Sequence, residues 1–361
     1  MFTRRPRFAA SVLAVLAFCA TSGQAPCWAQ AAARETATVP RVKLFATGGT
    51  ISNRSGGRLT ADELIKSIPG LERYARVEAE QFANVASSAL TLQQWVQLAK
   101  KIQQAFAADS SLAGVVVTSG TDTLEELAYF LNLTIRDERP VVVVGAMRNA
   151  STLGYEGPAN LLEGFRVAAD PASRRKGALV VLNDEINAAR EATKTDALRL
   201  QTFQSRPYGV LGVVDADRVV YYREPLKRRT FESEFDIASI DALPRVDVLL
   251  VYQGAPGDLI KAAVDNGAKG IVVATAGAGA TSGTQREGIR YALGQKVPVV
   301  ITTRTGSGRI SMEGRRANPD DETRLLIAGQ DLMPVKARVL LMLALTRTSD
   351  PSELQRIFSE Y

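Results

Sequence analysis

Residues 115–126 read Val-Val-Val-Thr-Ser-Gly-Thr-Asp-Thr-Leu-Glu-Glu, and this stretch decides the fold class. The run Val115–Thr118 predicts a strand, and its continuous apolar character indicates that both faces of the strand are buried. The next residues, Ser119-Gly120-Thr121, predict a tight turn, and a helix is predicted from Thr123 onward. A strand buried on both faces that leads into a helix is typical of a parallel sheet between layers of helices.

The same strand pattern recurs through the first two thirds of the chain. Further apolar runs predict strands at Val42–Ala46, Val141–Gly145, Ala178–Asn183 and Val210–Asp215. Capping boxes predict helix starts at Thr60 with Glu63, at Thr91 with Gln94 and at Thr123 with Glu126. We therefore predict an α/β protein whose large N-terminal domain contains a doubly wound, mostly parallel sheet.

A second, smaller α/β domain is predicted beyond a polar segment that has few periodic apolar positions. Its predicted strands are Val246–Tyr252, Gly270–Thr275 and Val299–Thr302, and its predicted helices span 258–266, 285–294, 334–345 and 352–361. We place the N-terminal domain at 40–222, a linker at 223–244 and the C-terminal domain at 245–361.

The N-terminus has the layout of a secretory signal peptide. Three arginines precede an apolar stretch from Phe8 to Ala20, and cleavage is predicted after Ala29. Residues 1–29 carry three arginines and no acidic residue, so cleavage lowers the formal net charge from +6 to +3. We predict a periplasmic or secreted protein with no membrane span after cleavage, and a retained anchor is the alternative. The mild positive charge does not indicate a nucleic acid as partner.

The composition excludes several kinds of catalytic site. The 361 residues include no histidine, and both cysteines, Cys19 and Cys27, lie in the predicted signal peptide. Ser-His-Asp and Cys-His sites therefore cannot form, and histidine or cysteine zinc sites are excluded. No clustered acidic motif supports a carboxylate cage, so we predict no metal site. A hydroxyl nucleophile would need activation by lysine, tyrosine or a carboxylate.

Two glycine-rich turns carry threonines to the ends of predicted strands. Gly48-Gly49-Thr50 follows the first predicted strand, and Gly120-Thr121-Asp122 follows the strand that ends at residue 118. Ligands bind beyond the carboxyl ends of strands in an open parallel sheet, so Thr50 and Thr121 are predicted to share one site. Lys194 is the candidate base, since a lysine buried near charge can change its pKa strongly. Each motif alone also fits a structural role: a tight turn, a helix start and a surface charge.

Four segments in the same order resemble bacterial type II L-asparaginases. They are Ala46–Ile51, Val117–Phe130, Val142–Arg148 running on through Gly157–Leu161, and Asn183–Phe203. The resemblance implies hydrolysis of the side-chain amide of L-asparagine to L-aspartate and ammonia without a cofactor. It also implies a homotetramer, with each site between the first domain of one subunit and the second domain of its neighbour. Two alternatives stay open: a glutaminase-asparaginase that also acts on L-glutamine, and a periplasmic amino-acid-binding protein without catalysis.

The same resemblance implies catalytic roles. Thr50 attacks the amide carbon to form an acyl-enzyme, while Thr121, Lys194 and Asp122 form a polar relay that helps to activate threonine or water. Family members carry a tyrosine on a loop after the first threonine, but residues 52–57 here contain none. Tyr155 is considered as a substitute, beside the alternative that it only packs.

The substrate contacts are also implied by the resemblance. Asp122, beside Thr121, binds the α-amino group, Ser87 holds the α-carboxylate, and the backbone of Ala146 orients the carboxamide. Ser88 stands where many members have a longer amide side chain, and two consequences are considered: weaker binding of the substrate, or an altered use of glutamine. The residues that a neighbouring subunit supplies match poorly, and Glu313 is only a weak candidate.

Overall fold

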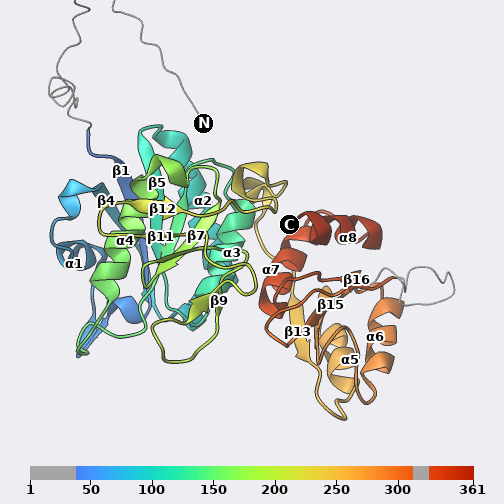
Figure 1. Cartoon of the computed structure of the whole chain (residues 1–361). Helices are drawn as coiled ribbons and strands as arrows, with labels where there is room; N and C mark the ends of the chain where they lie inside the picture. The colour runs from blue at the N-terminus through green and yellow to red at the C-terminus, as the bar shows by residue number, and fades with distance from the viewer. Residues whose placement is uncertain (1–37, 312–324) are drawn as a thin grey trace, which may run out of the picture. The chain divides into compact units, whose positions relative to one another are not determined.

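The first sheet is eight-stranded and mostly parallel (Figure 1). The computed structural model describes residues 38–311 and 325–361, so the predicted signal peptide, residues 1–29, and Glu313 lie outside the described residues. The order across the sheet is β12-β11-β8-β7-β6-β5-β1-β4. The strands are β1 (Arg41–Gly48), β4 (Arg76–Val85), β5 (Leu112–Thr118), β6 (Val141–Val144), β7 (Ala178–Leu182), β8 (Glu185–Ala188), β11 (Gly212–Val214) and β12 (Val219–Tyr221).

Helices cover both faces of this sheet, which confirms the predicted doubly wound arrangement. Alternate residues of each strand point to opposite faces. Val116 and Val142 therefore share a core with the helices on one face, whereas Val115 and Val117 share the core on the other face. The first face is covered by α1 (Ala61–Lys66) and α4 (Gly157–Ala169), and the second by α2 (Leu92–Ala108) and α3 (Leu124–Thr134).

One end of the sheet differs from the sequence prediction. The run at Val210–Asp215 was expected to join the parallel strands, but β11 is antiparallel to both β8 and β12. The cause is a hairpin between β7 and β8, in which Asn183 and Asp184 have φ angles of 56° and 65°. A type I′ turn requires positive φ at both central residues. This turn reverses the chain, so β8 pairs antiparallel with β7 and the strands beyond it form an antiparallel edge of the sheet.

The second sheet is parallel throughout and has its own covering helices. Its order is β13 (Val246–Leu250), β14 (Gly270–Thr275), β15 (Val299–Thr303) and β16 (Ile327–Ala328). One face packs against α5 (Asp258–Asp265) and α6 (Gln285–Gly294), and the other against α7 (Pro334–Ala344). Since α7 also packs against α3, the two sheets share one continuous apolar core. The last helix, α8 (Pro351–Glu360), contacts β16 and α7.

The segment that we expect to link the domains is packed rather than free. Phe235, Ile237 and Ile240 are buried in the same core as α3, and Ser233 Oγ donates a hydrogen bond to the Leu133 carbonyl.

The remaining short elements are η2 (Thr50–Ser52), β2 (Asn53–Arg54), β3 (Gly57–Arg58), η3 (Leu71–Arg73), η4 (Ser87–Ala89), η5 (Pro171–Ser173), β9 (Thr193–Lys194), β10 (Phe203–Gln204), η6 (Thr230–Glu232) and η7 (Ile237–Ser239).

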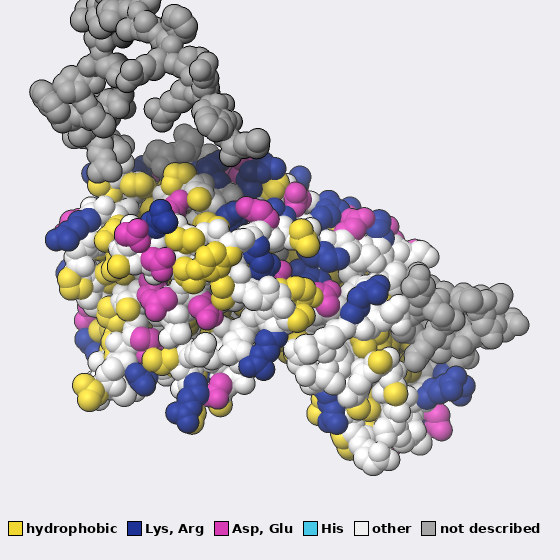
Figure 2. All heavy atoms as spheres, viewed as in Figure 1, with side chains coloured by type: hydrophobic (Ala, Val, Ile, Leu, Met, Phe, Trp, Pro, Cys, Tyr) yellow, Lys and Arg dark blue, Asp and Glu magenta, His cyan; other side chains and the backbone are white. Residues whose placement is uncertain are grey.

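The surface carries charges of both signs. On the face seen in Figure 2, basic and acidic side chains are interspersed rather than gathered in a basic stripe. Nucleic-acid-binding proteins typically show such a stripe or patch. Among the described residues, no helix combines the length and the apolar character that a membrane crossing requires.

A buried carboxyl group in α4 makes the stability of this fold depend on pH. Burial and the neighbouring Asp184 raise the pKa of Glu163 to about 8, from 4.5. Between these two values the unfolded chain loses the proton and the folded chain keeps it, so this group lowers the stability as pH rises. Above pH 8 the cost reaches at most about 5 kcal/mol.

The substitution Glu163→Gln removes this titration and keeps an oxygen that can accept the Asp184 N–H bond. We expect the difference in the free energy of unfolding, variant minus wild type, to be more positive at pH 8 than at pH 5. Urea unfolding at the two pH values measures this, and an equal difference at both would contradict it.

Candidate active site

The carboxyl ends of β1 and β5 bring the two predicted threonine turns into contact. Gly48 and Gly49 have φ angles of 104° and 87°, which side-chain-bearing residues rarely adopt. A methyl group on Gly49 would lie 2.2 Å from the backbone nitrogen of Gly120, so only glycine permits this close approach. Thr50 and Thr121 directly follow the two touching glycines. The structure therefore brings the two threonine turns to one place on the sheet.

Lys194 joins the second threonine to a carboxylate. Its Nζ donates to Thr121 Oγ1 over 3.0 Å and to Asp122 Oδ1 over 2.6 Å. The Lys194 side chain is 15 % exposed, whereas that of Asp122 is 73 % exposed. A largely shielded ammonium interacts strongly with nearby negative charge. This arrangement can favour loss of a proton from a threonine hydroxyl, while Asp122 stays accessible to a cationic ligand.

The other predicted residues lie around the same turns. Ser87 is buried, and a methyl group on Gly120 would lie 2.8 Å from its Oγ. Ala146 is also buried, and it follows Gly145, where a methyl group would lie 3.2 Å from Thr121 Cγ2. Ser88, next to Ser87 in η4, is exposed. The structure thus places Ser87 and Ala146 beside the threonine turns.

Tyr155 reaches the first turn, but its hydroxyl group is already engaged. The hydroxyl donates to the carbonyl of Ile51, the residue after Thr50, over 2.5 Å. Burial, and then the charge of Glu156, raises the pKa of Tyr155 to about 12, so the group remains protonated near neutral pH. Tyr155 therefore holds the backbone next to Thr50 and cannot act there as a phenolate base near neutral pH.

The capping box predicted for Thr123 and Glu126 is wrong. The Thr123 side chain accepts no capping hydrogen bond, and its backbone N–H donates instead to Ser87 Oγ over 3.4 Å. Glu126 turns towards α7, where Arg338 Nη1 lies 3.4 Å from its Oε2. The boxes at Thr60 and Thr91 do form. Tertiary partners replace the local cap at the α3 start.

Two buried charged residues beside the site were not predicted from the sequence. Glu125, in the first turn of α3, accepts hydrogen bonds from Thr193 Oγ1 and from the backbone N–H of Lys194. Lys336, in α7, is fully buried and lies 3.8 Å from Glu125 Oε2. The available signal was a lysine within the largely apolar stretch 334–345, where a charge needs a buried partner.

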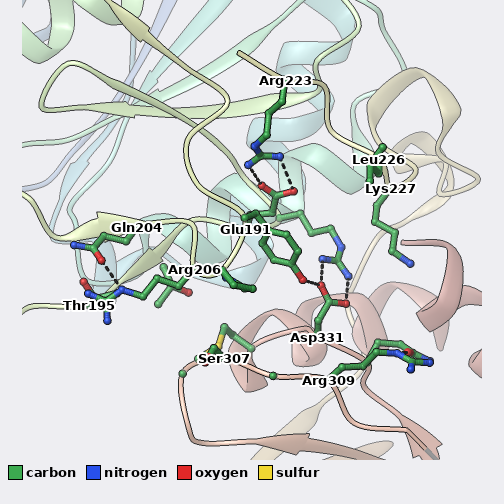
Figure 3. Close-up of a pocket in the computed structure, with 18 of the residues that line it drawn as sticks. Glu191, Thr195, Gln204, Arg206, Arg223, Leu226, Lys227, Ser307, Arg309 and Asp331 are labelled. Atoms are coloured by element: carbon green, nitrogen blue, oxygen red, sulfur yellow. Dashed lines mark hydrogen bonds and ion pairs between the residues drawn. The ribbon is translucent and has the colours of Figure 1, made fainter. Parts of the chain in front are cut away.

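A separate pocket is lined in part by residues at the β9–β10 hairpin, among them Thr195 and Gln204 (Figure 3). Its volume is about 730 Å³, and its lining includes Thr193 and Thr195 but none of the predicted site residues. The intervening Lys194 points to Thr121 instead, as expected for adjacent residues of an extended segment. Asp331, which Figure 3 labels among the lining residues, forms a bidentate ion pair with Arg190.

Metal ligands are sparse in the parts of the chain that the structure describes. Within 38–311 and 325–361, no three His, Cys, Asp or Glu side chains come together as a metal site would require. The groups that the candidate site offers for chemistry are therefore hydroxyls, one ammonium, one carboxylate and backbone N–H groups.

The fold and these groups define an α/β protein with a histidine-free, threonine-lined polar site at the carboxyl ends of a parallel sheet. Residues 41–227 match the family described as Asparaginase, N-terminal, and residues 245–358 match the Glutaminase/Asparaginase C-terminal domain. The chain belongs to the asparaginase family.

Individual relatives agree with this family over most of their length. The chain is 40% identical to the L-asparaginase 2 of Bacillus subtilis (strain 168), with 92% of this chain and 89% of that protein covered. It is 38% identical to a probable periplasmic L-asparaginase of Haemophilus influenzae, with 90% and 94% covered. A crystal structure of a probable cytoplasmic L-asparaginase from Campylobacter jejuni superposes with a TM-score of 0.84 at 39% identity, covering 89% of this chain and all of the other.

Proposed function

We propose that this protein is an L-asparagine amidohydrolase that converts L-asparagine to L-aspartate and ammonia through a threonine nucleophile. The observation that carries the proposal is the placement of Lys194 Nζ, 3.0 Å from Thr121 Oγ1 and 2.6 Å from Asp122 Oδ1. This pair lies beside the glycine contact that Thr50 follows. Family membership and the named relatives support the same activity.

Thr50 and the relay divide the reaction into two steps. The Thr50 hydroxyl oxygen forms a bond to the side-chain carbonyl carbon, and the amide nitrogen takes up a proton and leaves as ammonia. Water then attacks the ester carbon, which releases L-aspartate and restores the hydroxyl group. The ammonium of Lys194 helps Thr121 to orient the attacking group and to pass protons. Backbone N–H groups of the glycine turns can stabilise the oxyanion of each step.

Binding of a free amino acid requires contacts to both of its charged ends. The carboxylate of Asp122 is exposed and suits the α-ammonium group, beside Thr121. We assign the α-carboxylate to Ser87 and the carboxamide to the backbone of Ala146, with Ser88 at the rim. Such contacts hold a small, polar substrate in a reactive orientation, since it offers little apolar area to bury.

The proposal extends to organisation and location. We propose N- and C-terminal asparaginase domains at 40–222 and 245–361 joined by the linker 223–244, and a homotetramer whose neighbouring subunits complete each site. Export by a signal peptide at 1–29 to the periplasm or beyond follows from the sequence layout. A periplasmic name among the relatives supports this location, whereas the Campylobacter structure carries a cytoplasmic one.

Ammonia release tests the proposed activity. The mature chain, stripped of metals with EDTA, is expected to release one ammonia for each L-aspartate formed from L-asparagine. L-Glutamine is measured in parallel, because the C-terminal match also includes glutaminases in its description. Comparable kcat/KM for both amides would favour a glutaminase-asparaginase. Binding of L-asparagine without ammonia release would overturn the enzyme proposal in favour of a binding protein.

A further inference from the structure

The carboxylate of Glu125 contacts both residues of the short strand that carries Lys194. Its Oε2 accepts a hydrogen bond of 2.7 Å from Thr193 Oγ1, and its Oε1 accepts one of 3.2 Å from the Lys194 backbone N–H. Glu125 itself is 8% exposed. Hydrogen bonds to a shielded carboxylate are stronger than those between neutral groups. Glu125 therefore anchors the main chain from which the Lys194 side chain extends.

Lys336 holds the preceding residues and neutralises this carboxylate. Its Nζ donates to the carbonyl oxygens of Ala189 over 2.9 Å and of Arg190 over 3.1 Å, and also to that of Ala192. The same Nζ lies 3.8 Å from Glu125 Oε2, and Lys336 is 0% exposed. Three carbonyl acceptors and one nearby carboxylate allow a charged lysine to be buried. Helix α7, which packs on the second sheet, thus fixes residues 189–192, which follow β8 of the first sheet.

The pocket side of the same segment is held by a second contact from the C-terminal part. Arg190 Nη1 and Nη2 lie 2.7 and 2.8 Å from the two carboxylate oxygens of Asp331. Bidentate ion pairs of this kind fix the orientation of the guanidinium group as well as its distance from the carboxylate. Asp331 also accepts a hydrogen bond from Tyr208, in the segment that follows β10. The segment 189–194 is therefore held on both of its sides.

We propose that Glu125, supported by Lys336, is a positioning residue for Lys194. The inference rests on the proposed function, in which Lys194 acts on Thr121. The four-carbon stem of a lysine gives its ammonium group many rotamers, so its position depends on a fixed backbone. Catalytic groups need to stay within about 0.5 Å of the productive geometry. Glu125 supplies this constraint without touching the substrate.

Glu126 offers a matched control for the test. It is the next residue of α3, and it also pairs with a basic residue of α7, Arg338, at 3.4 Å. Among the described residues, its side chain forms no hydrogen bond or ion pair with β9. The substitutions Glu125→Gln and Glu126→Gln each remove one carboxylate charge from the same helix turn and loosen the same helix pair.

Steady-state kinetics of the full chain separate positioning from general packing. We expect Glu125→Gln to lower kcat for ammonia release from L-asparagine by about tenfold or more, with KM changed less than about twofold, because only the fixed geometry is lost. Glu126→Gln should keep kcat within about twofold even if the two variants lose similar Tm. Equal kcat losses in the two variants, or an unchanged kcat in Glu125→Gln, would overturn the proposal.

Crystal structures of the variants give a readout that does not depend on activity. In Glu125→Ala we expect Lys194 Nζ to leave hydrogen-bond distance of Thr121 Oγ1, while Glu126→Gln keeps the 3.0 Å contact. An unchanged contact in Glu125→Ala would refute the positioning role. A wild-type chain that releases no ammonia would instead refute the proposed function, and the crystallographic comparison would still decide whether Glu125 positions Lys194.

Discussion

Replacing Thr50 with alanine is expected to lower kcat for L-asparagine hydrolysis by about 10⁴-fold or more, because no acyl-enzyme can form without the attacking oxygen. Thr50 follows the glycine contact and is partly exposed, so its loss removes little buried surface. We therefore expect an unchanged circular dichroism spectrum. Ammonia release under saturating substrate measures the effect, and Thr50→Ser should retain part of the activity since it keeps the hydroxyl.

The control for this variant is Thr47, near the end of β1 and three residues before Thr50. Thr47 is buried, and its Oγ1 donates to the Thr118 carbonyl over 2.6 Å. Thr47→Val removes this bond and should cost about 1 kcal/mol of stability with a far smaller loss of kcat. If Thr50→Ala kept the wild-type kcat, Thr50 would not be the nucleophile.

Replacing Lys194 with methionine is expected to lower kcat by about 10² to 10⁴-fold, the usual size of a lost proton-transfer group. Methionine keeps much of the side-chain length and removes the charge that lies between Thr121 and Asp122. Lys227, which lines the separate pocket, provides the matched control. Lys227→Met should change kcat little. Ammonia release at a fixed pH measures both variants.

A double variant tests whether Lys194 and Thr121 act as one unit. Groups in one relay give strongly non-additive losses. The double variant Lys194→Met/Thr121→Ala should therefore have a kcat close to that of whichever single variant has the lower kcat. Losses that multiply would show two independent roles and would contradict the relay.

The buried strands were predicted well because a short, continuous apolar run is typical of a strand whose two faces are both buried. The sequence did not predict β4, whose residues are all exposed or half-buried because the strand lies at the sheet edge, where one neighbour is missing. It also treated the run at 210–215 as parallel. The antiparallel pairing of β11 arises because the turn at Asn183 and Asp184 places the reversed strand β8 between β7 and β11, and an apolar run does not encode the dihedral angles of that turn.

The threonine turns were predictable because a glycine pair after a strand marks a close backbone approach, and the contact between Gly49 and Gly120 confirms that approach. The supports of Lys194 were not predictable. Glu125 looked like an ordinary first-turn acid, and Lys336 is far from it in sequence, so only the packing of α7 on α3 brings them together. The capping box expected at Thr123 and Glu126 is absent for a similar reason, since tertiary packing lets Ser87 accept the Thr123 backbone N–H while Glu126 pairs with Arg338.

The long sequence distance between Lys194 and its supports affects the order in which a ribosome makes a working site. Every reactive group of the proposed centre has been synthesised once residue 194 is added, yet Asp331 lies 141 residues beyond its partner Arg190, and Lys336 comes later still. A growing chain therefore carries its threonines and lysine through many seconds of translation, at about 5–20 residues per second, before they can be held in register. Hydrolysis would begin only after α7 has docked, and therefore not before biosynthesis ends.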